Sequence, residues 1–311
     1  MKIKSDFFKI SVIIPVFNTS KFVRKAVESA VDITEVGEVI LVEDGSTDSS
    51  LIECIDLNNQ YEKVRLFRHP NGENRGAGAS RNLGIEKSTC DYIAFLDADD
   101  WYLPNRFTKD RMVYDKFPNA DVIYSCSIYE EDFIQNRKLL YGVTEDPRMK
   151  WGKEIEPIKF YELKLKSKLV LFNTNSVTIK KGFLISNKCF DTRLRLHQDS
   201  ELWNRLMRRG SFYAAEWEEP VSVVRKHSGN RITHRSSRSQ LKMIAVQIDN
   251  IGLDNLHSFE IDDLYSKVIR LQSKGFIYNL FRRVYYYSFY CVNFFDKKNL
   301  LEKIRKAYAI D

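Results

Sequence analysis

Cysteine is scarce in this chain, and its distribution argues against a zinc-binding protein and against a disulfide-stabilised one. The 311 residues include five cysteines, none of them in the CxxC spacing that is typical of zinc sites. An odd and scattered set does not suit a disulfide framework, so we expect a reducing compartment. The N-terminal residues are basic but contain no apolar run of signal-peptide length, which favours residence in the cytoplasm. The cysteines are Cys54, Cys90, Cys126, Cys189 and Cys291.

Two glycine motifs of nucleotide-binding proteins are also missing. A dinucleotide-binding fold needs G-x-G-x-x-G directly after its first strand, where this chain has Pro15-Val16-Phe17-Asn18. No G-x-x-x-x-G-K-[ST] sequence occurs, which excludes P-loop chemistry. Gly76-Ala77-Gly78 comes far later and continues with Ser80-Arg81, so it replaces neither motif.

The charge balance is basic, with a net charge of +7. Acidic and basic residues are mixed through most of the chain, so the composition permits anionic ligands or a membrane surface without requiring nucleic acid. We therefore expect no nucleic-acid partner. A hydrophobic content of 43% is sufficient for a sizeable core, and the length suits one large or two ordinary domains.

Short apolar runs alternate with segments of helical spacing in the N-terminal part of the chain. Strands are predicted at 10–16, 39–42, 64–68 and 92–96, and the first three are followed by residues typical of helix starts. This alternation predicts an α/β fold with a largely parallel sheet. A further strand is predicted over residues 120–129.

The strand signals stop near residue 235, and only helices are predicted beyond it. We therefore divide the chain into a catalytic domain, 1–235, and a helical C-terminal region, 236–311. The helix predicted at 276–295 is rich in aromatic residues but too polar at its centre to span a membrane. It suits a peripheral contact with the inner face of the membrane, a homodimer seam, or packing against the catalytic domain.

The most informative stretch is the apolar run 93–96, which ends in Asp97-Ala98-Asp99-Asp100. In open α/β sheets, ligands bind outside the carboxyl ends of the strands. Crowded carboxylates repel one another there unless a cation lies among them. Mg²⁺ or Mn²⁺ carrying a diphosphate fits, because these ions prefer oxygen ligands. The alternative is an acidic turn that caps the next helix, whose Pro104 suits a first turn.

Five motifs occur in order across residues 8–230. They are Pro15-Val16-Phe17-Asn18, Glu43-Asp44-Gly45-Ser46-Thr47-Asp48, Asn74-Arg75-Gly76 with Ala79-Ser80-Arg81-Asn82-Leu83-Gly84, Asp97-Ala98-Asp99-Asp100, and Gln198-Asp199 before Leu202-Trp203. This series resembles glycosyltransferase family 2, whose members have the Rossmann-like GT-A fold. The resemblance implies an inverting hexosyl- or N-acetylhexosaminyl-transferase that uses a divalent metal and a nucleotide-sugar donor, usually a UDP-sugar. It also implies a saccharide or lipid-linked acceptor in surface polysaccharide or glycan biosynthesis.

The resemblance assigns donor-binding roles to residues after the first two strands. Pro15 and Phe17 resemble the start of the loop that walls the nucleotide base, although Phe17 also suits simple core packing. Glu43 stands where the family more often has Asp to accept a hydrogen bond from uracil, so its extra methylene changes the reach of the carboxylate. Asp44 either contacts the ligand or caps the turn at 46–48.

Further roles fall around the acidic cluster. Arg81 is expected to meet either a phosphate or a carboxylate of the cluster. Asp97 resembles the family's contact to the ribose or uridine, and Asp99 its metal ligand. His227 follows the last predicted strand, where some family members place a histidine against the metal or the diphosphate; the alternative is a solvated loop histidine.

Asp199 resembles the general base. Inverting transfer needs a carboxylate that takes the proton of the acceptor hydroxyl as its oxygen attacks the anomeric carbon. The family usually has Glu-Asp at this place, and Gln198 replaces the Glu here. The alternative role for Asp199 is a plain helix N-cap.

Two other functions remain open from the residues. A nucleotidyltransferase also uses acids at strand ends and a metal, but it would need a glycine-rich signature with a catalytic Lys or Arg after the first strand. A non-catalytic nucleotide-sugar-binding relative is the second alternative, and retention of Asp97, Asp99 and Asp199 favours the enzyme.

Overall fold

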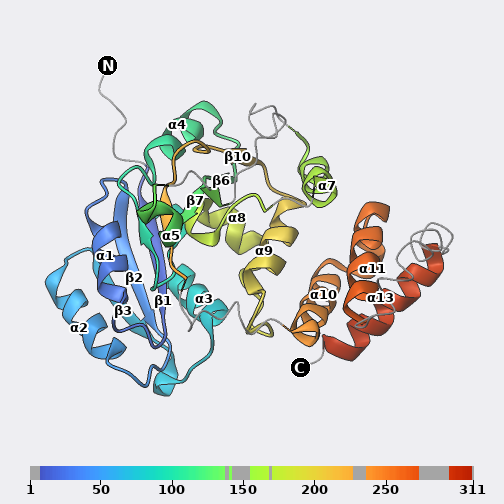
Figure 1. The fold of residues 1–311 in the computed structure, drawn as a ribbon, viewed down its shortest axis with the longest axis horizontal. Coiled ribbons are helices and arrows are strands. Elements are labelled where there is room, and N and C mark those ends of the chain that lie inside the picture. The colour runs from blue at the N-terminus through green and yellow to red at the C-terminus, as the bar shows by residue number, and fades with distance from the viewer. Residues whose placement is uncertain are drawn as a thin grey trace. The chain divides into compact units, whose positions relative to one another are not determined.

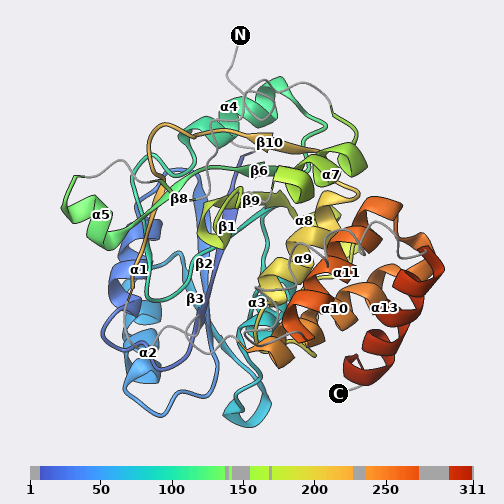
Figure 2. The same ribbon diagram turned by 45° about the vertical axis from the view of Figure 1, so that its right-hand side comes forward.

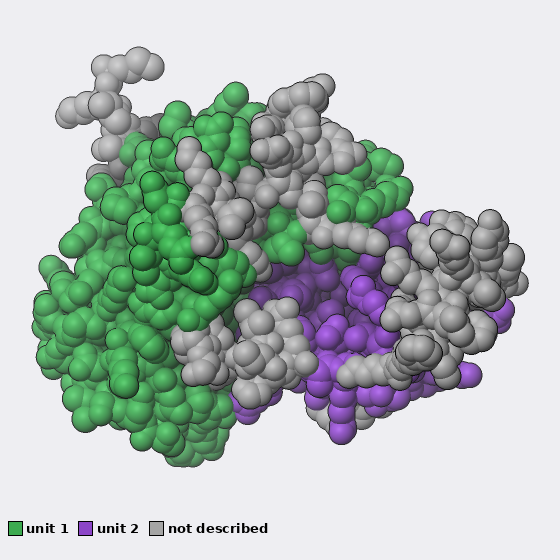
Figure 3. All heavy atoms as spheres, viewed as in Figure 1, with its two compact units in different colours: residues 1–192, 206–228 green, residues 193–205, 229–311 purple. Residues whose placement is uncertain are grey.

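The computed structural model describes residues 8–136, 140–141, 155–167, 170–226, 236–272 and 294–309. By its internal contacts the chain forms two units, which Figure 3 shows in green and purple. Unit 1 comprises residues 1–192 and 206–228, and unit 2 comprises residues 193–205 and 229–311. The predicted domain division at residue 235 stays a prediction. In the described part of the chain, no helix is long and apolar enough to cross a membrane.

The main sheet of unit 1 has seven strands in its described part, in the order β10-β6-β9-β4-β1-β2-β3. The strands β4, β1, β2 and β3 run parallel to one another, and β10 runs parallel to β6, whereas β9 is antiparallel to both β4 and β6. The central strands are continuous apolar runs because both faces of a parallel sheet are buried. The strands are β1 (Ile10–Val16), β2 (Val36–Glu43), β3 (Val64–Arg68), β4 (Tyr92–Phe95), β6 (Val122–Tyr124), β9 (Val177–Lys180) and β10 (Phe212–Ala214).

Helices cover both faces of this sheet. The helices α1 (Val23–Val31) and α2 (Ser50–Gln60) lie on one face, and α3 (Ala77–Lys87) lies on the other (Figures 1 and 2). A Cβ at Gly84 would lie 2.4 Å from Cγ2 of Ile13, so glycine lets α3 approach β1 closely. This close packing fixes the N-terminus of α3 beside the central strands.

A smaller sheet of four strands completes the described part of unit 1, in the order β5-β11-β7-β8. It shows that the single strand predicted at 120–129 is wrong, because β6 belongs to the main sheet and β7 to the smaller one. The chain changes partners between them: Ser125 N donates to Ser176 O, and Cys126 N donates to Glu216 O. The remaining elements of unit 1 are β5 (Trp101–Tyr102), β7 (Ser127–Tyr129), β8 (Leu140–Tyr141), β11 (Ser222–Val224), η1 (Pro70–Gly72), α4 (Thr108–Lys116), α5 (Glu130–Ile134), α7 (Pro157–Ser167), η2 (Thr174–Ser176) and α8 (Lys181–Ser186).

Unit 2 is helical in its described part. Its core joins apolar residues of the last three described helices, among them Ile248, Val268 and Leu301. Residues 276–293 of the predicted aromatic helix lie outside the described residues. The mixed α/β architecture with a parallel-rich sheet, followed by a helical C-terminal portion, confirms the predicted fold class. The elements are α9 (Gln198–Met207), most of which belongs to unit 2, α10 (Ser237–Ile251), η4 (Leu253–Asn255), α11 (Ser258–Gln272) and α13 (Phe294–Tyr308).

Candidate functional site

The carboxyl ends of three neighbouring strands bring most of the predicted donor-site residues to one edge of the main sheet. The strands β4, β1 and β2 are parallel neighbours, with Ile13 opposite Phe95 and Val16 opposite Glu43. Segments that follow these strands therefore leave the sheet side by side, where ligands bind in α/β proteins. The predicted residues gathered there are Pro15, Phe17, Glu43, Asp44, Asp97 and Asp99.

The segment after β1 is fastened to the segment after β2. Asn18 Oδ1 accepts a hydrogen bond from Thr47 N at 2.8 Å, and Asn18 N donates to Ser46 Oγ at 3.0 Å. Asn18 has a φ of 53°, in the left-handed region that asparagine adopts more readily than most residues. These bonds fix the backbone beside Phe17, whose side chain is partly exposed.

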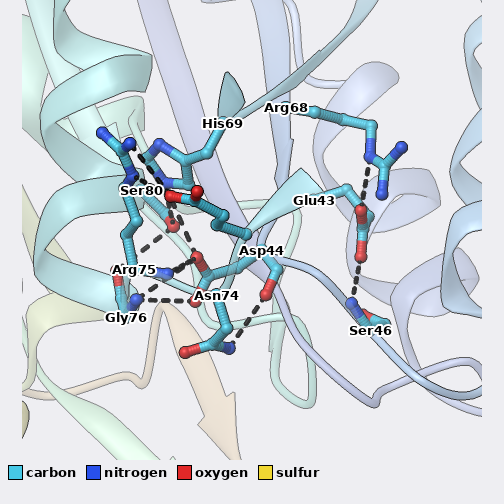
Figure 4. Close-up of polar contacts among 10 residues, drawn as sticks. Glu43, Asp44, Ser46, Arg68, His69, Asn74, Arg75, Gly76 and Ser80 are labelled. Carbon is cyan, nitrogen blue, oxygen red and sulfur yellow. Dashed lines mark hydrogen bonds and ion pairs between the residues drawn. The ribbon is translucent and has the colours of Figure 1, made fainter. Parts of the chain in front are cut away.

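Glu43 is fully buried at the end of β2, and both of its carboxylate oxygens accept hydrogen bonds from the protein (Figure 4). Oε1 accepts from Ser46 N at 2.5 Å, and Oε2 accepts from Arg68 Nε at 2.7 Å. Burial opposes ionisation, but the bonds from Ser46 and Arg68 outweigh it and lower the pKa of Glu43. Glu43 therefore stabilises its own loop in this structure, and its contact to a base stays a prediction.

Asp44 is also buried, and it holds the loop that precedes α3 (Figure 4). Its Oδ1 accepts from Arg75 N at 2.8 Å and its Oδ2 from Gly76 N at 2.9 Å. Its backbone carbonyl accepts from Asn74 Nδ2 at 2.8 Å. The motif at 74–76 is thus bound to the end of β2 through one aspartate.

The alternative that Asp44 caps the turn at 46–48 is wrong. Within this turn, Ser46 N donates to Glu43 and Thr47 N donates to Asn18, while the oxygens of Asp44 accept hydrogen bonds from Arg75 N and Gly76 N. Asp44 is held toward residues 74–76 because Gly45, with a φ of +71°, turns the chain; a Cβ there would lie 2.5 Å from Gly72 O.

His69 and Ser80 also belong to this cluster, and sequence reasoning missed both. His69 Nε2 lies 3.1 Å from Ser80 Oγ and 3.6 Å from Asp44 Oδ1 (Figure 4). Because the same ring nitrogen meets both groups, this is not the arrangement of a nucleophilic triad, in which serine and aspartate meet different nitrogens. Burial lowers the pKa of His69, which favours the neutral ring.

At the end of β4, Asp97 is paired with Arg81. Arg81 Nη2 lies 2.6 Å from Asp97 Oδ1, and the Arg81 side chain is 5% exposed while that of Asp97 is 38% exposed. Arg81 was expected to meet either a phosphate or a carboxylate, and in the described structure it meets the carboxylate of Asp97. The guanidinium of Arg81 is thus a buried positive charge that faces the more exposed carboxylate of Asp97.

Asp100 is the buried member of the acidic cluster. Its Oδ2 accepts from Asn175 Nδ2 at 2.6 Å, and its Oδ1 accepts from Arg225 N at 2.7 Å. Burial and the like charges of Asp99 and Asp97 raise the pKa of Asp100 well above its usual range, despite these hydrogen bonds. The carboxylates are therefore close enough to repel one another.

Asn175 connects both ends of the acidic loop. Besides Asp100, it binds Asp97 N, which donates to Asn175 Oδ1 at 3.0 Å. The carbonyl of Asn175 in turn accepts from Arg106 Nε at 2.9 Å, and Arg106 is fully buried in an ion pair with Asp110. The sequence contains no signal for this brace, since its members come from segments far apart along the chain.

Asp199 belongs to unit 2 and lies in the first turn of α9. Its Oδ1 accepts a hydrogen bond from Ser200 N at 2.7 Å, and the side chain is partly exposed. The helix begins at Gln198, so Asp199 lies within its first turn and not before it. His227 lies outside the described residues.

Comparisons with known proteins give the family. Residues 11–178 match the family model described as Glycosyl transferase family 2. An uncharacterized glycosyltransferase of Rickettsia prowazekii is 32% identical over 266 residues, which cover 85% of this chain and 73% of the relative. The chain belongs to glycosyltransferase family 2. The predicted resemblance is confirmed, and so is the prediction of a glycosyltransferase.

Solved structures show the same fold. TarS from S. aureus in complex with UDP-GlcNAc aligns with a TM-score of 0.63 at 16% identity, over 86% of this chain and 73% of TarS. A mannosyltransferase from Pyrobaculum calidifontis in complex with GDP-Man and Mn²⁺ aligns with a TM-score of 0.54 at 13% identity, over 98% and 87%. The GT-A fold is thereby confirmed for this family 2 member. The chain spans 29% and 60% of the length of two further Rickettsia glycosyltransferases that it matches.

The acidic loop of this glycosyltransferase fits a divalent cation by its charge. Among the described residues, no group of three or more His, Cys, Asp and Glu side chains is arranged to hold a metal alone. Mg²⁺ in transferases is typically held by one or two carboxylates together with substrate phosphates. Burial raises the pKa of Asp100, and the like charges of Asp99 and Asp97 raise it further, so a cation beside these acids would relieve their repulsion.

Proposed function

We propose that this family 2 glycosyltransferase moves a hexosyl or N-acetylhexosaminyl group, with inversion, from a UDP-sugar to a saccharide or lipid-linked acceptor. The observation that carries the proposal is the crowding of Asp97, Asp99 and Asp100 at the carboxyl end of β4. The nucleotide sugars bound by TarS and by the mannosyltransferase support a nucleotide-sugar donor. Surface polysaccharide or glycan biosynthesis would be the setting.

In this proposal each acid has a separate task. Asp99, with His227, would hold Mn²⁺ or Mg²⁺, which when bound stabilises the charge of the departing diphosphate. Asp97, oriented by Arg81, accepts a hydrogen bond from the ribose. Asp199 takes the proton of the acceptor hydroxyl as the oxygen attacks the anomeric carbon.

Residues at the carboxyl ends of β1 and β2, and directly after them, complete the donor site in this proposal. Pro15 and Phe17 wall the base, on a loop that Asn18 fixes to its neighbour. Glu43 and Asp44 keep that surface rigid through their internal hydrogen bonds. Contact of the C-terminal helices with the inner face of a membrane, and a homodimer, stay predictions.

A donor screen tests the reaction. UDP- and GDP-sugars are incubated with Mn²⁺ or Mg²⁺, nucleotide release is measured, and the anomer of the first sugar product is read by NMR. We expect release of UDP, loss of release in EDTA, and an inverted anomer. Release of pyrophosphate from a nucleoside triphosphate and a sugar phosphate would indicate a nucleotidyltransferase, and binding of UDP without any turnover would indicate a non-catalytic relative.

The base is tested by Asp199→Asn. The substitution is isosteric, so the protein should fold and bind UDP with Mn²⁺ normally, while transfer falls by about 10²–10⁴. Asn is as good a helix cap as Asp, so a purely structural Asp199 would give near-normal transfer. That result would mean that another carboxylate is the base, and Asp191 would be tested next.

A further inference from the structure

The segment that carries Asp199 is bound to the C-terminal helices. Residues 193–205 lie, along the sequence, between segments of unit 1, yet their contacts place them in unit 2 with residues 229–311. The helices α10, α11 and α13 form the body of that unit (Figure 2). A role for the C-terminal helices therefore has to be sought next to Asp199.

One side chain of α10 joins both flanks of Asp199. Asn250 Nδ2 donates to Glu201 Oε1 at 3.0 Å, and Asn250 Oδ1 accepts from Arg193 Nη2 at 3.3 Å. Glu201 is fully buried, so its position is determined by these partners and by Arg205, whose Nε lies 2.8 Å from the same oxygen. The amide of Asn250 thus fixes residues on either side of Asp199.

Arg193 ties the same segment to two helices at once. Its Nη1 lies 2.8 Å from Asp249 Oδ2 on α10 and donates to Ala309 O, just beyond α13, at 3.1 Å. Asp249 also pairs with Arg305 of α13 at 3.0 Å. The start of the segment is therefore anchored where α10 and α13 meet.

The contacts continue along α10. His197 Nε2 lies 3.1 Å from Ser239 Oγ, and Asn204 Nδ2 donates to Gln247 Oε1 at 3.2 Å. Ser239 and Asn250 are separated by about 16 Å along the helix axis. Polar contacts over such a length fix the direction of the first turn of α9, and with it the direction of Asp199.

We propose that Asn250 is a positioning residue for the catalytic base, and that unit 2 acts in catalysis by holding residues 193–205. The inference rests on the proposed function, because a position of Asp199 matters only if Asp199 takes the proton. Displacement of a reacting group by about 1 Å costs about 10² in rate. Loss of the Asn250 bridge should therefore lower kcat while the donor KM stays nearly constant.

Asn250→Ala in the full chain tests the proposal. Amide hydrogen exchange should become faster in residues 193–205 and stay unchanged in residues 92–102. With the sugar nucleotide selected by the donor screen, kcat should fall by about 10² and the donor KM should change by less than about twofold. Arg193→Ala removes the other end of the bridge and should give the same result if Asn250→Ala fails to fold.

A double-mutant cycle separates this proposal from the proposed function. If Asn250 acts through Asp199, adding Asn250→Ala to Asp199→Asn should cost less than about twofold more in kcat. Full multiplication of the two losses, or unchanged exchange at 193–205, would overturn the role of Asn250. Near-normal kcat in Asp199→Asn alone would instead overturn the assigned base.

A matched control lies in the same unit. Asp254 has a side chain 97% exposed and pairs with Lys298 at 3.1 Å. Asp254→Ala should leave both exchange and kcat unchanged, because exposed ion pairs contribute little. An equal loss in this variant would mean that any change in unit 2 lowers the rate, and would also overturn the specific role of Asn250.

Discussion

The acids that follow β2 and the acids that follow β4 look alike in the sequence and are used differently by the fold. After β2, Glu43 and Asp44 are buried, and their oxygens accept hydrogen bonds from Ser46, Arg68 and the backbone at 75–76. Hydrogen bonds lower the pKa of Glu43. This pair is satisfied within the protein.

The acids after β4 differ from that pair in their mutual repulsion, although Asp97 pairs with Arg81 and both oxygens of Asp100 accept hydrogen bonds. Asp97 and Asp99 are partly exposed, whereas Asp100 is buried, and this burial together with the charges of Asp99 and Asp97 raises the pKa of Asp100 well above its usual range. One buried guanidinium, that of Arg81, meets the group through Asp97. A cluster that repels itself gains from an added cation, whereas a satisfied pair does not. We therefore expect mutual repulsion, and not a place at a strand end, to distinguish the proposed ligand site after β4 from the structural pair after β2.

The largest expected effect is a loss of transfer activity when Asp99, one of the acids after β4, is replaced. Asp99→Ala should lower transfer by about 10⁴ if Asp99 holds the proposed metal, because a bound metal would stabilise the departing diphosphate by several kcal/mol. The metal-free protein should lose no stability, since removal of a like charge favours Asp100. Nucleotide release measures the loss of transfer, and thermal unfolding in EDTA measures the stability of the metal-free protein. An Asp99→Ala variant that keeps its activity in EDTA would contradict this role.

The next effect concerns Asn175, whose hydrogen bonds hold both ends of the acidic loop. Asn175→Ala removes the bonds to Asp97 N and Asp100 Oδ2, so the loop should lose its geometry and the affinity for Mn²⁺ with UDP should fall by about 10–100-fold. Titration calorimetry measures that affinity. Thr178→Val is the matched control: Thr178 is equally buried but bonds Asp110, so this variant should lose stability with no change in Mn²⁺ affinity.

Local patterns were sufficient to predict much of the fold. Apolar runs such as 10–16 and 39–42 predicted parallel strands because such strands are buried on both faces. The strand predicted at 120–129 was wrong because Ser125 and Cys126 pass from one sheet to another, which depends on Ser176 and Glu216. Apolar periodicity contains no information about such distant partners.

For the candidate site too, local patterns predicted where the acids lie but not which groups they contact. Motifs located the acids at the strand ends, but the partner of Asp44 is a backbone segment at 75–76 that no local pattern connects to it. Asn175 lies 75 residues from Asp100 in the sequence, and its amide becomes a brace only when β9 inserts beside β4. Side-chain partners across the sheet are products of the tertiary fold.

A smaller effect should appear in stability alone. Asp44→Ala leaves the N–H groups of Arg75 and Gly76 without their buried acceptor, which should cost about 1–3 kcal/mol in the free energy of unfolding. Urea unfolding measures this cost. Asp56→Ala is the control, because Asp56 forms an exposed ion pair with Arg24 that should contribute less than about 1 kcal/mol. Equal costs in the two variants would remove the structural role given to Asp44.

The smallest expected effect is the pH dependence of stability at Glu43. Its pKa is lower in the folded than in the unfolded protein, so its ionised form stabilises the fold above the ordinary value of 4.5. That contribution is lost as the pH falls through the folded pKa. Glu43→Gln offers one acceptor oxygen to the two donors, so it should be less stable than the natural protein at pH 7, and the difference should narrow below about pH 4.5.

Urea unfolding between pH 7 and pH 3 measures the narrowing. The control is Glu86→Gln, because the Glu86 side chain is 68% exposed and should give a difference that is small and independent of pH. A Glu43→Gln difference that stays constant with pH would mean that the charge of Glu43 contributes nothing to folding. Packing alone would then hold the acids after β2 in place. They would differ from the mutually repelling acids after β4 in burial and not in charge.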